Sequence, residues 1–111
     1  MAEVTPTPDK DAQDNKVFAI LAYFGILFLV PLFAAKESPF ARYHANQGAI
    51  LFILEIIACI VAFILAFVPF GWIIGYLLYL AIAVLAILGI LNAVKGEKKE
   101  LPLIGQFKII K

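Results

Sequence analysis

Residues 49–94 read AILFILEIIACIVAFILAFVPFGWIIGYLLYLAIAVLAILGILNAV, and this stretch decides the fold class. It carries one charged residue, Glu55, and a clear break at residues 69–71 (PFG). Each half is long enough to cross about 30 Å of hydrocarbon as a helix that rises about 1.5 Å per residue. We therefore expect membrane-spanning helices at about 48–68 and 72–94, joined by a tight turn.

A third apolar run, residues 17–35 (VFAILAYFGILFLVPLFAA), lies nearer the N-terminus and is also uncharged. Its length predicts another span, and Pro31 predicts a kink or an early end, because proline lacks the N–H that a helix interior needs. A cleaved signal peptide would follow a short basic start, whereas residues 1–15 are long and acidic. We expect a retained first span.

The remaining segments are polar. Residues 1–15 have no apolar periodicity and predict a disordered tail, which leaves 16–111 as a single membrane domain. In residues 36–47 (KESPFARYHANQ), Ser38-Pro39 is typical of a helix start, and it predicts a short amphipathic interfacial helix before the second span. Residues 95–111 open with a helix-stop glycine and predict an interfacial C-terminal tail. The predicted class is an all-α membrane protein with three transmembrane helices.

Composition supports a membrane protein. Of the 111 residues 64% are apolar, the mean hydropathy is +1.00 and the net charge is +1. A soluble domain of this length could not bury so much hydrocarbon, and the charge does not indicate nucleic acid. The sequence has no catalytic triad, carboxylate pair or phosphate-binding glycine loop, so we expect neither an enzyme nor a cofactor. It has one cysteine and one histidine, and we expect no metal site.

Basic residues near the helix ends predict the orientation. Lys36 and Arg42 in the polar loop, with five lysines in the tail, make seven, against Lys10 and Lys16 before the first span. Cytoplasmic segments carry the excess of such residues. We expect the loop and the C-terminus in the cytoplasm and the N-terminus outside, in the plasma membrane of a prokaryote.

Glu55 is the main candidate for function, because an acid near the middle of a span costs about 2 to 3 kcal/mol. Helical spacing places it on a stripe of small and polar residues that should face another helix. Its expected partner is Tyr23, Asn92 or a backbone carbonyl. The interpretation as an interhelical hydrogen bond is favoured over a proton or cation site shared with His44. The stripe comprises His44, Gly48, Leu51, Glu55, Cys59, Ala62 and Ala66.

Other residues predict contact with partners. Pairs of small residues four apart mark surfaces for self-association or for another membrane protein; these are Gly71 and Gly75, Gly89 and Ala93, and the series Ala58, Ala62 and Ala66. At the cytoplasmic face, the expected contact residues are Lys36, Arg42, Tyr43, Gln47, Lys98 and Lys99.

Three blocks carry a family resemblance. SPFARYHANQG at 38–48, LNAVKGE at 91–97 and LPLIG at 101–105 resemble the Tic-twenty-like family of small multi-pass membrane proteins, over about residues 16 to 107. That family is named after a channel-like component of the chloroplast inner-envelope import machinery. The resemblance implies a remote relative of a translocation subunit.

Three functions remain open at this stage. The favoured one is an accessory or structural subunit of a membrane transport or translocation complex. The first alternative is a homo-oligomeric ion or proton channel that uses Glu55. The second is a lipid-organising or assembly factor that depends on the basic tail and on anionic lipid.

Overall fold

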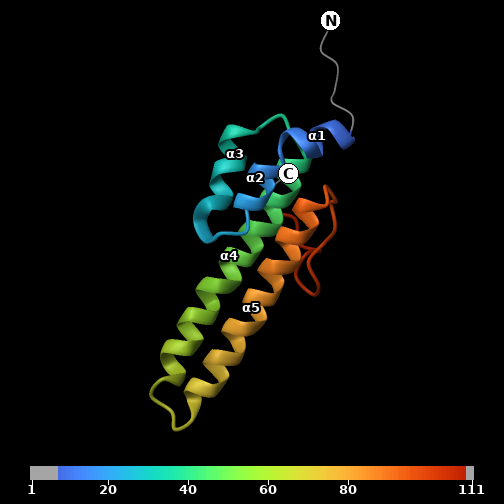
Figure 1. Ribbon diagram of the computed structural model, residues 1–111. Helices are drawn as coiled ribbons and strands as arrows, with labels where there is room; N and C mark the ends of the chain where they lie inside the picture. The colour runs from blue at the N-terminus through green and yellow to red at the C-terminus, as the bar shows by residue number, and fades with distance from the viewer. Residues whose placement is uncertain (1–7, 110–111) are drawn as a thin grey trace, which may run out of the picture.

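Two long antiparallel helices form the body of the protein in the computed structural model, which describes residues 8–109 (Figure 1). Helix α4 spans Pro39–Leu65 and helix α5 spans Gly71–Val94. By length and composition both can cross a membrane. They are joined at the predicted break, where Phe70 has a φ of 63° and Gly71 packs on the Leu65 carbonyl.

The predicted first span is wrong. In place of one helix the chain forms α2 (Lys16–Leu21), a 3-10 turn η1 (Gly25–Phe28) and α3 (Leu29–Ala34). The direction reverses after α2, so α3 returns to the end from which α2 started (Figure 1). Gly25 has a φ of +60°, a conformation that suits glycine. The structure thus has two long apolar helices and a short re-entrant helical hairpin.

Pro31 does not cause this break, contrary to the predicted kink. It lies in the first turn of α3, where a backbone N–H has no partner within the helix anyway. The chain instead bends at Ala22 to Gly25, where it meets α4. A side chain at Gly48 of α4 would overlap the Ala22 carbonyl, so the two segments can pack only without one.

The N-terminal segment is partly ordered. Helix α1 spans Pro8–Asp14, with Asp11 and Ala12 buried, where we predicted a disordered tail over 1–15. Residues 1–7 of that prediction lie outside the described part of the chain. Because α1 and the C-terminal tail occupy the same end of the molecule, the prediction that they lie on opposite membrane faces does not fit this fold (Figure 1).

The predicted helix start at Ser38-Pro39 is confirmed, because the Ser38 side chain accepts a bond from the Ala41 N–H and Pro39 is the first helical residue. Across the described residues, the structure does not contain the separate interfacial helix that we predicted before the second span. Residues 39–47 are the first turns of α4 and are largely buried, since α1, α2 and the tail cover them. Residues 95–109 fold back onto α4, and Leu101 is 2% exposed.

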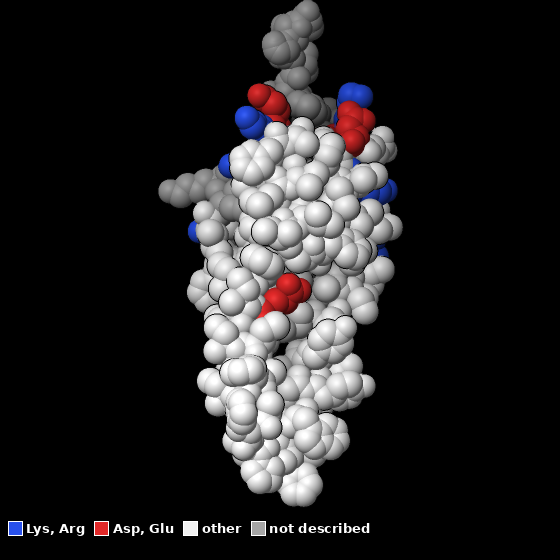
Figure 2. Space-filling view, turned by 90° about the vertical axis from the view of Figure 1, so that its left-hand side faces the viewer, with Lys and Arg blue, Asp and Glu red and all other residues white. Residues whose placement is uncertain are grey.

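The molecule therefore has two parts. The polar cap comprises α1 to α3, the start of α4 through Leu51, and residues 93–109, and it contains the buried core. The lower hairpin, residues 52–92, exposes apolar side chains such as Phe63 and Trp72, as a lipid-facing surface would. Figure 2 shows the charged groups gathered at one end, with a single acidic side chain on the otherwise uncharged body.

Candidate functional site: a hydrogen-bonded polar cap

The start of α4 is held by an acid from α1. The Ser38 hydroxyl donates to Asp11 Oδ1 at 2.6 Å, and the Phe40 N–H donates to Asp11 Oδ2 at 2.9 Å. A carboxylate at a helix N-terminus satisfies unpaired N–H groups and interacts favourably with the helix dipole. Sequence reasoning missed Asp11, because its partners lie 27 and 29 residues away.

His44 joins three segments of the cap. Its Nε2 lies 2.8 Å from the Glu97 carbonyl oxygen, and its Nδ1 lies 2.6 Å from the Tyr23 hydroxyl. A carbonyl can only accept, so Nε2 carries the hydrogen, and a neutral ring then accepts from Tyr23 at Nδ1. The ring is fully buried. His44 therefore connects α4 to the re-entrant hairpin and to the tail.

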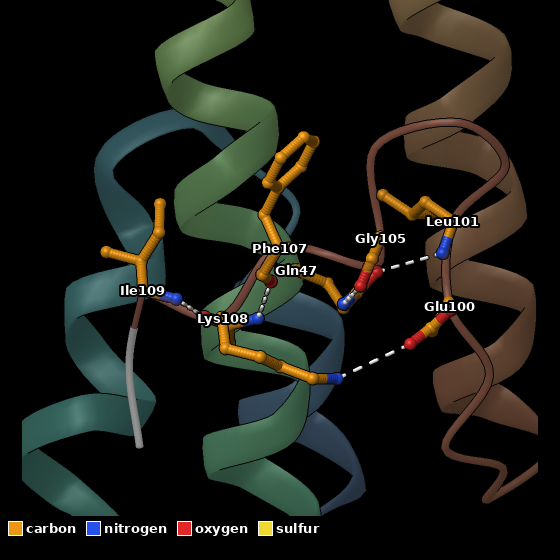
Figure 3. A network of polar contacts seen from close by, with 8 residues as sticks. Gln47, Glu100, Leu101, Gly105, Phe107, Lys108 and Ile109 are labelled. Atoms are coloured by element: carbon orange, nitrogen blue, oxygen red, sulfur yellow. Dashed lines mark hydrogen bonds and ion pairs between the residues drawn. The ribbon is translucent and has the colours of Figure 1, made fainter.

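Two amides on α4 hold the tail (Figure 3). Gln47 donates to the Gly105 carbonyl and accepts from the Leu101 N–H, both at 2.9 Å. Asn46 donates to the Phe107 carbonyl at 2.8 Å and accepts from the Ile109 N–H at 2.6 Å. Each side chain pairs as a peptide group would, so an irregular tail keeps its backbone bonds satisfied.

Gln47 was predicted to contact partners, but it is fully buried and binds the tail instead. Asn46 was missed in the sequence. The remaining residues that we predicted to contact partners lie in two places. Lys99 forms an exposed ion pair with Glu97 at 3.5 Å. The others meet at a groove of about 610 Å³ on the surface of the cap, lined by Lys36, Glu37, Pro39, Arg42, Tyr43, Asn46, Lys98 and Lys108.

Neither predicted side-chain partner reaches Glu55. Tyr23 binds His44, and the Asn92 amide lies 3.4 Å from the Lys99 carbonyl. Within residues 8–109 no hydrogen bond to Glu55 is formed. The side chain instead lines a cavity of about 300 Å³ in the lower hairpin, with Ala62, Gly75 and Tyr79 among its other walls.

Glycines from two of the predicted small-residue pairs pack within the chain. Gly89 lies against the Tyr23 ring, and a side chain there would overlap it. Gly75 faces Ala62 across the hairpin. These contacts let α5 approach the re-entrant hairpin and α4 closely. Among residues 8–109, no three His, Cys, Asp or Glu side chains are grouped as metal ligands would be.

These features define a small all-α membrane protein in which an apolar helical hairpin carries a folded polar cap. Within that class, the model of the magnetosome magnetite crystal formation protein family, MamF/MmsF, matches residues 14–108. The chain belongs to this family.

The relatives include archaeal membrane proteins and magnetosome proteins. The UPF0132 membrane protein MJ1443 of Methanocaldococcus jannaschii is 43% identical over 101 residues, covering 83% of this chain and 83% of its own. A second protein of that archaeon, UPF0132 membrane protein MJ1527, is 36% identical over 83% of this chain and 66% of its own. The magnetosome protein MamF of Paramagnetospirillum magneticum is 30% identical over 82% and 79%. No solved structure matches the chain significantly.

The resemblance to the Tic-twenty-like family is wrong, because the matching family is MamF/MmsF. The blocks that suggested it build the cap. Ser38 caps α4, His44 and Gln47 hold neighbouring segments, and the LPLIG block supplies Leu101 and Gly105 to Gln47. The translocation role rested on that resemblance and loses its basis.

Proposed function

We propose that this protein is a non-enzymatic accessory subunit of a membrane assembly, which presents its polar cap to a partner at one membrane face. The supporting observation is the network of buried hydrogen bonds within the polar cap. His44, Gln47 and Asp11 connect segments that are far apart in the sequence. A hairpin that served only as an anchor would not need such a structure, whereas a docking surface gains from being rigid.

The proposed orientation follows from charge. In the described chain every Lys and Arg lies in the cap or directly beside it, and the turn between α4 and α5 has none. Cytoplasmic segments are enriched in these residues. We therefore propose a cytoplasmic cap in a prokaryotic plasma membrane, with both described ends of the chain on that side.

The relatives are compatible with this role. The family description connects its magnetosome members with magnetite crystal formation, and the archaeal relatives are named only as membrane proteins. A protein that organises a membrane surface would be consistent with both names, and this is the role that we propose for the present chain.

Photo-crosslinking in native membranes tests the proposal. A crosslinking residue at Glu37 or Lys99 in the cap should capture a distinct protein, and one at Trp72 by the far turn should not. All three positions are exposed in the fold. Capture only of other copies of the chain from all three positions would contradict an accessory role.

A homo-oligomeric ion or proton channel is the second candidate, supported by Glu55 beside its cavity in the lower hairpin. Ion flux into vesicles containing the purified protein separates the two functions. A channel predicts flux that collapses in Glu55→Gln, whereas an accessory subunit predicts no flux and unchanged capture by the cap.

A further inference from the structure

The groove on the polar cap gathers basic side chains from three parts of the chain. Lys36 comes from the loop before α4, Arg42 from the first turns of α4, and Lys98 and Lys108 from the tail. Among the described lining residues Glu37 is the one carboxylate. The folded chain thus concentrates positive charge that the sequence distributes over more than 70 residues.

The cap positions one of these cations closely. Asn46 bonds the backbone on both sides of Lys108, at Phe107 and at Ile109 (Figure 3). The Lys108 ammonium then lies 5.5 Å from the centre of the Tyr43 ring and 3.4 Å from Glu100 Oε2. The tail therefore holds its lysine at the edge of the groove, with support from an aromatic face.

The length of α4 indicates how deep the groove would lie in a bilayer. A helix covers about 30 Å of hydrocarbon in about 20 residues. Counting back from Leu65, where α4 ends, that length reaches about Ala45. Arg42 and the loop that carries Lys36 come just before it. If the hairpin spans the bilayer, the groove opens where the near leaflet has its phosphate groups.

We propose that this groove binds the phosphate group of an anionic membrane lipid. Arginine can donate two parallel hydrogen bonds to phosphate oxygens, and lysine supplies a compact point charge. Several basic groups at this depth are the usual means of binding anionic headgroups. The site goes beyond the accessory role and does not rest on it, because a lipid can bind whether or not a protein partner does.

Thermal unfolding of the full chain in nonionic detergent tests the site. Phosphatidylglycerol, phosphatidylcholine or inorganic phosphate is added in increasing amounts, and the rise in Tm gives an apparent affinity. Lys36→Gln with Lys98→Gln removes two exposed groove cations. Lys16→Gln with Lys95→Gln makes the same change in net charge outside the groove. Each protein is compared with its own Tm without additive, so altered stability does not distort the result.

We expect phosphatidylglycerol to raise the Tm more than phosphatidylcholine, and the groove variant to bind it about tenfold or more weakly. The control variant should keep the wild-type affinity. Stabilisation by inorganic phosphate alone, lost in the groove variant, would assign the same site to a soluble phosphate compound. Equal losses in both variants, or no preference for phosphatidylglycerol, would overturn the proposal.

Discussion

At the scale of single residues, Tyr23 and His44 are the most consequential pair. The Tyr23 side chain is buried under α5 beside Gly89, and its hydroxyl occupies the one His44 nitrogen that the tail does not use. From the sequence, Tyr23 was a candidate hydrogen-bond partner of Glu55, and His44 was a candidate member of a shared proton or cation site. The structure pairs them with each other, because each is buried and needs a hydrogen-bonding partner there.

Loss of the Tyr23 hydroxyl should destabilise the cap. Tyr23→Phe leaves a buried His44 nitrogen without a donor, which should lower the free energy of unfolding by about 1 to 3 kcal/mol. Tyr79→Phe is the control, because it removes a hydroxyl from a side chain that is 68% exposed. Thermal unfolding in detergent measures both. Equal Tm values for the two variants would mean that the Tyr23 bond contributes nothing.

At the scale of elements, the re-entrant hairpin is the feature that propensity could not anticipate. Residues 17–35 have the length and hydropathy of a membrane span. Those properties are the same whether the segment forms one continuous helix or two short ones. The interruption of the helix is stabilised by three close contacts: Ala22 with Gly48, Tyr23 with Gly89, and Tyr23 with His44. These contacts are tertiary and leave no periodic pattern in the sequence.

Two glycines of α5 should respond differently to the same change. Gly89→Ala forces a methyl group into the Tyr23 ring and should lower the Tm, since overpacking typically costs about 1 to 3 kcal/mol. Gly75→Ala meets Ala62 at an ordinary 3.4 Å and should keep or raise the Tm, because alanine is the better helix former. A matching decrease in both would indicate a general intolerance of α5.

At the scale of the whole molecule, the fold separates a polar end from an apolar body. The charged segments that flank α4 and α5 meet at one end because the chain between them crosses and returns. Glu55 is the exception, and it lies half-buried beside the cavity of the lower hairpin. The arrangement explains why a sequence with a net charge of only +1 can still present a basic groove.

Cysteine labelling from either side of the membrane tests this topology. With Cys59→Ala as background, single variants Gln13→Cys and Glu37→Cys should react from the same side, and Phe70→Cys from the opposite side. All three positions are exposed. A three-span arrangement would place positions 13 and 37 on opposite sides, so labelling from different sides would contradict the re-entrant hairpin.

The sequence by itself determined the helical class, the two long apolar helices, the turn between them and the start of α4 at Ser38. These features depend on hydropathy, on proline and glycine, and on capping, all of which act within a few residues. Only the tertiary structure determined the other features. These are the helical hairpin formed by residues 17–35, the hydrogen-bond partners of His44 and Gln47, the capping of α4 by Asp11, and the basic groove. Each of these features requires contacts between groups tens of residues apart in the sequence. Tertiary packing sets such contacts, and the local sequence pattern does not contain them.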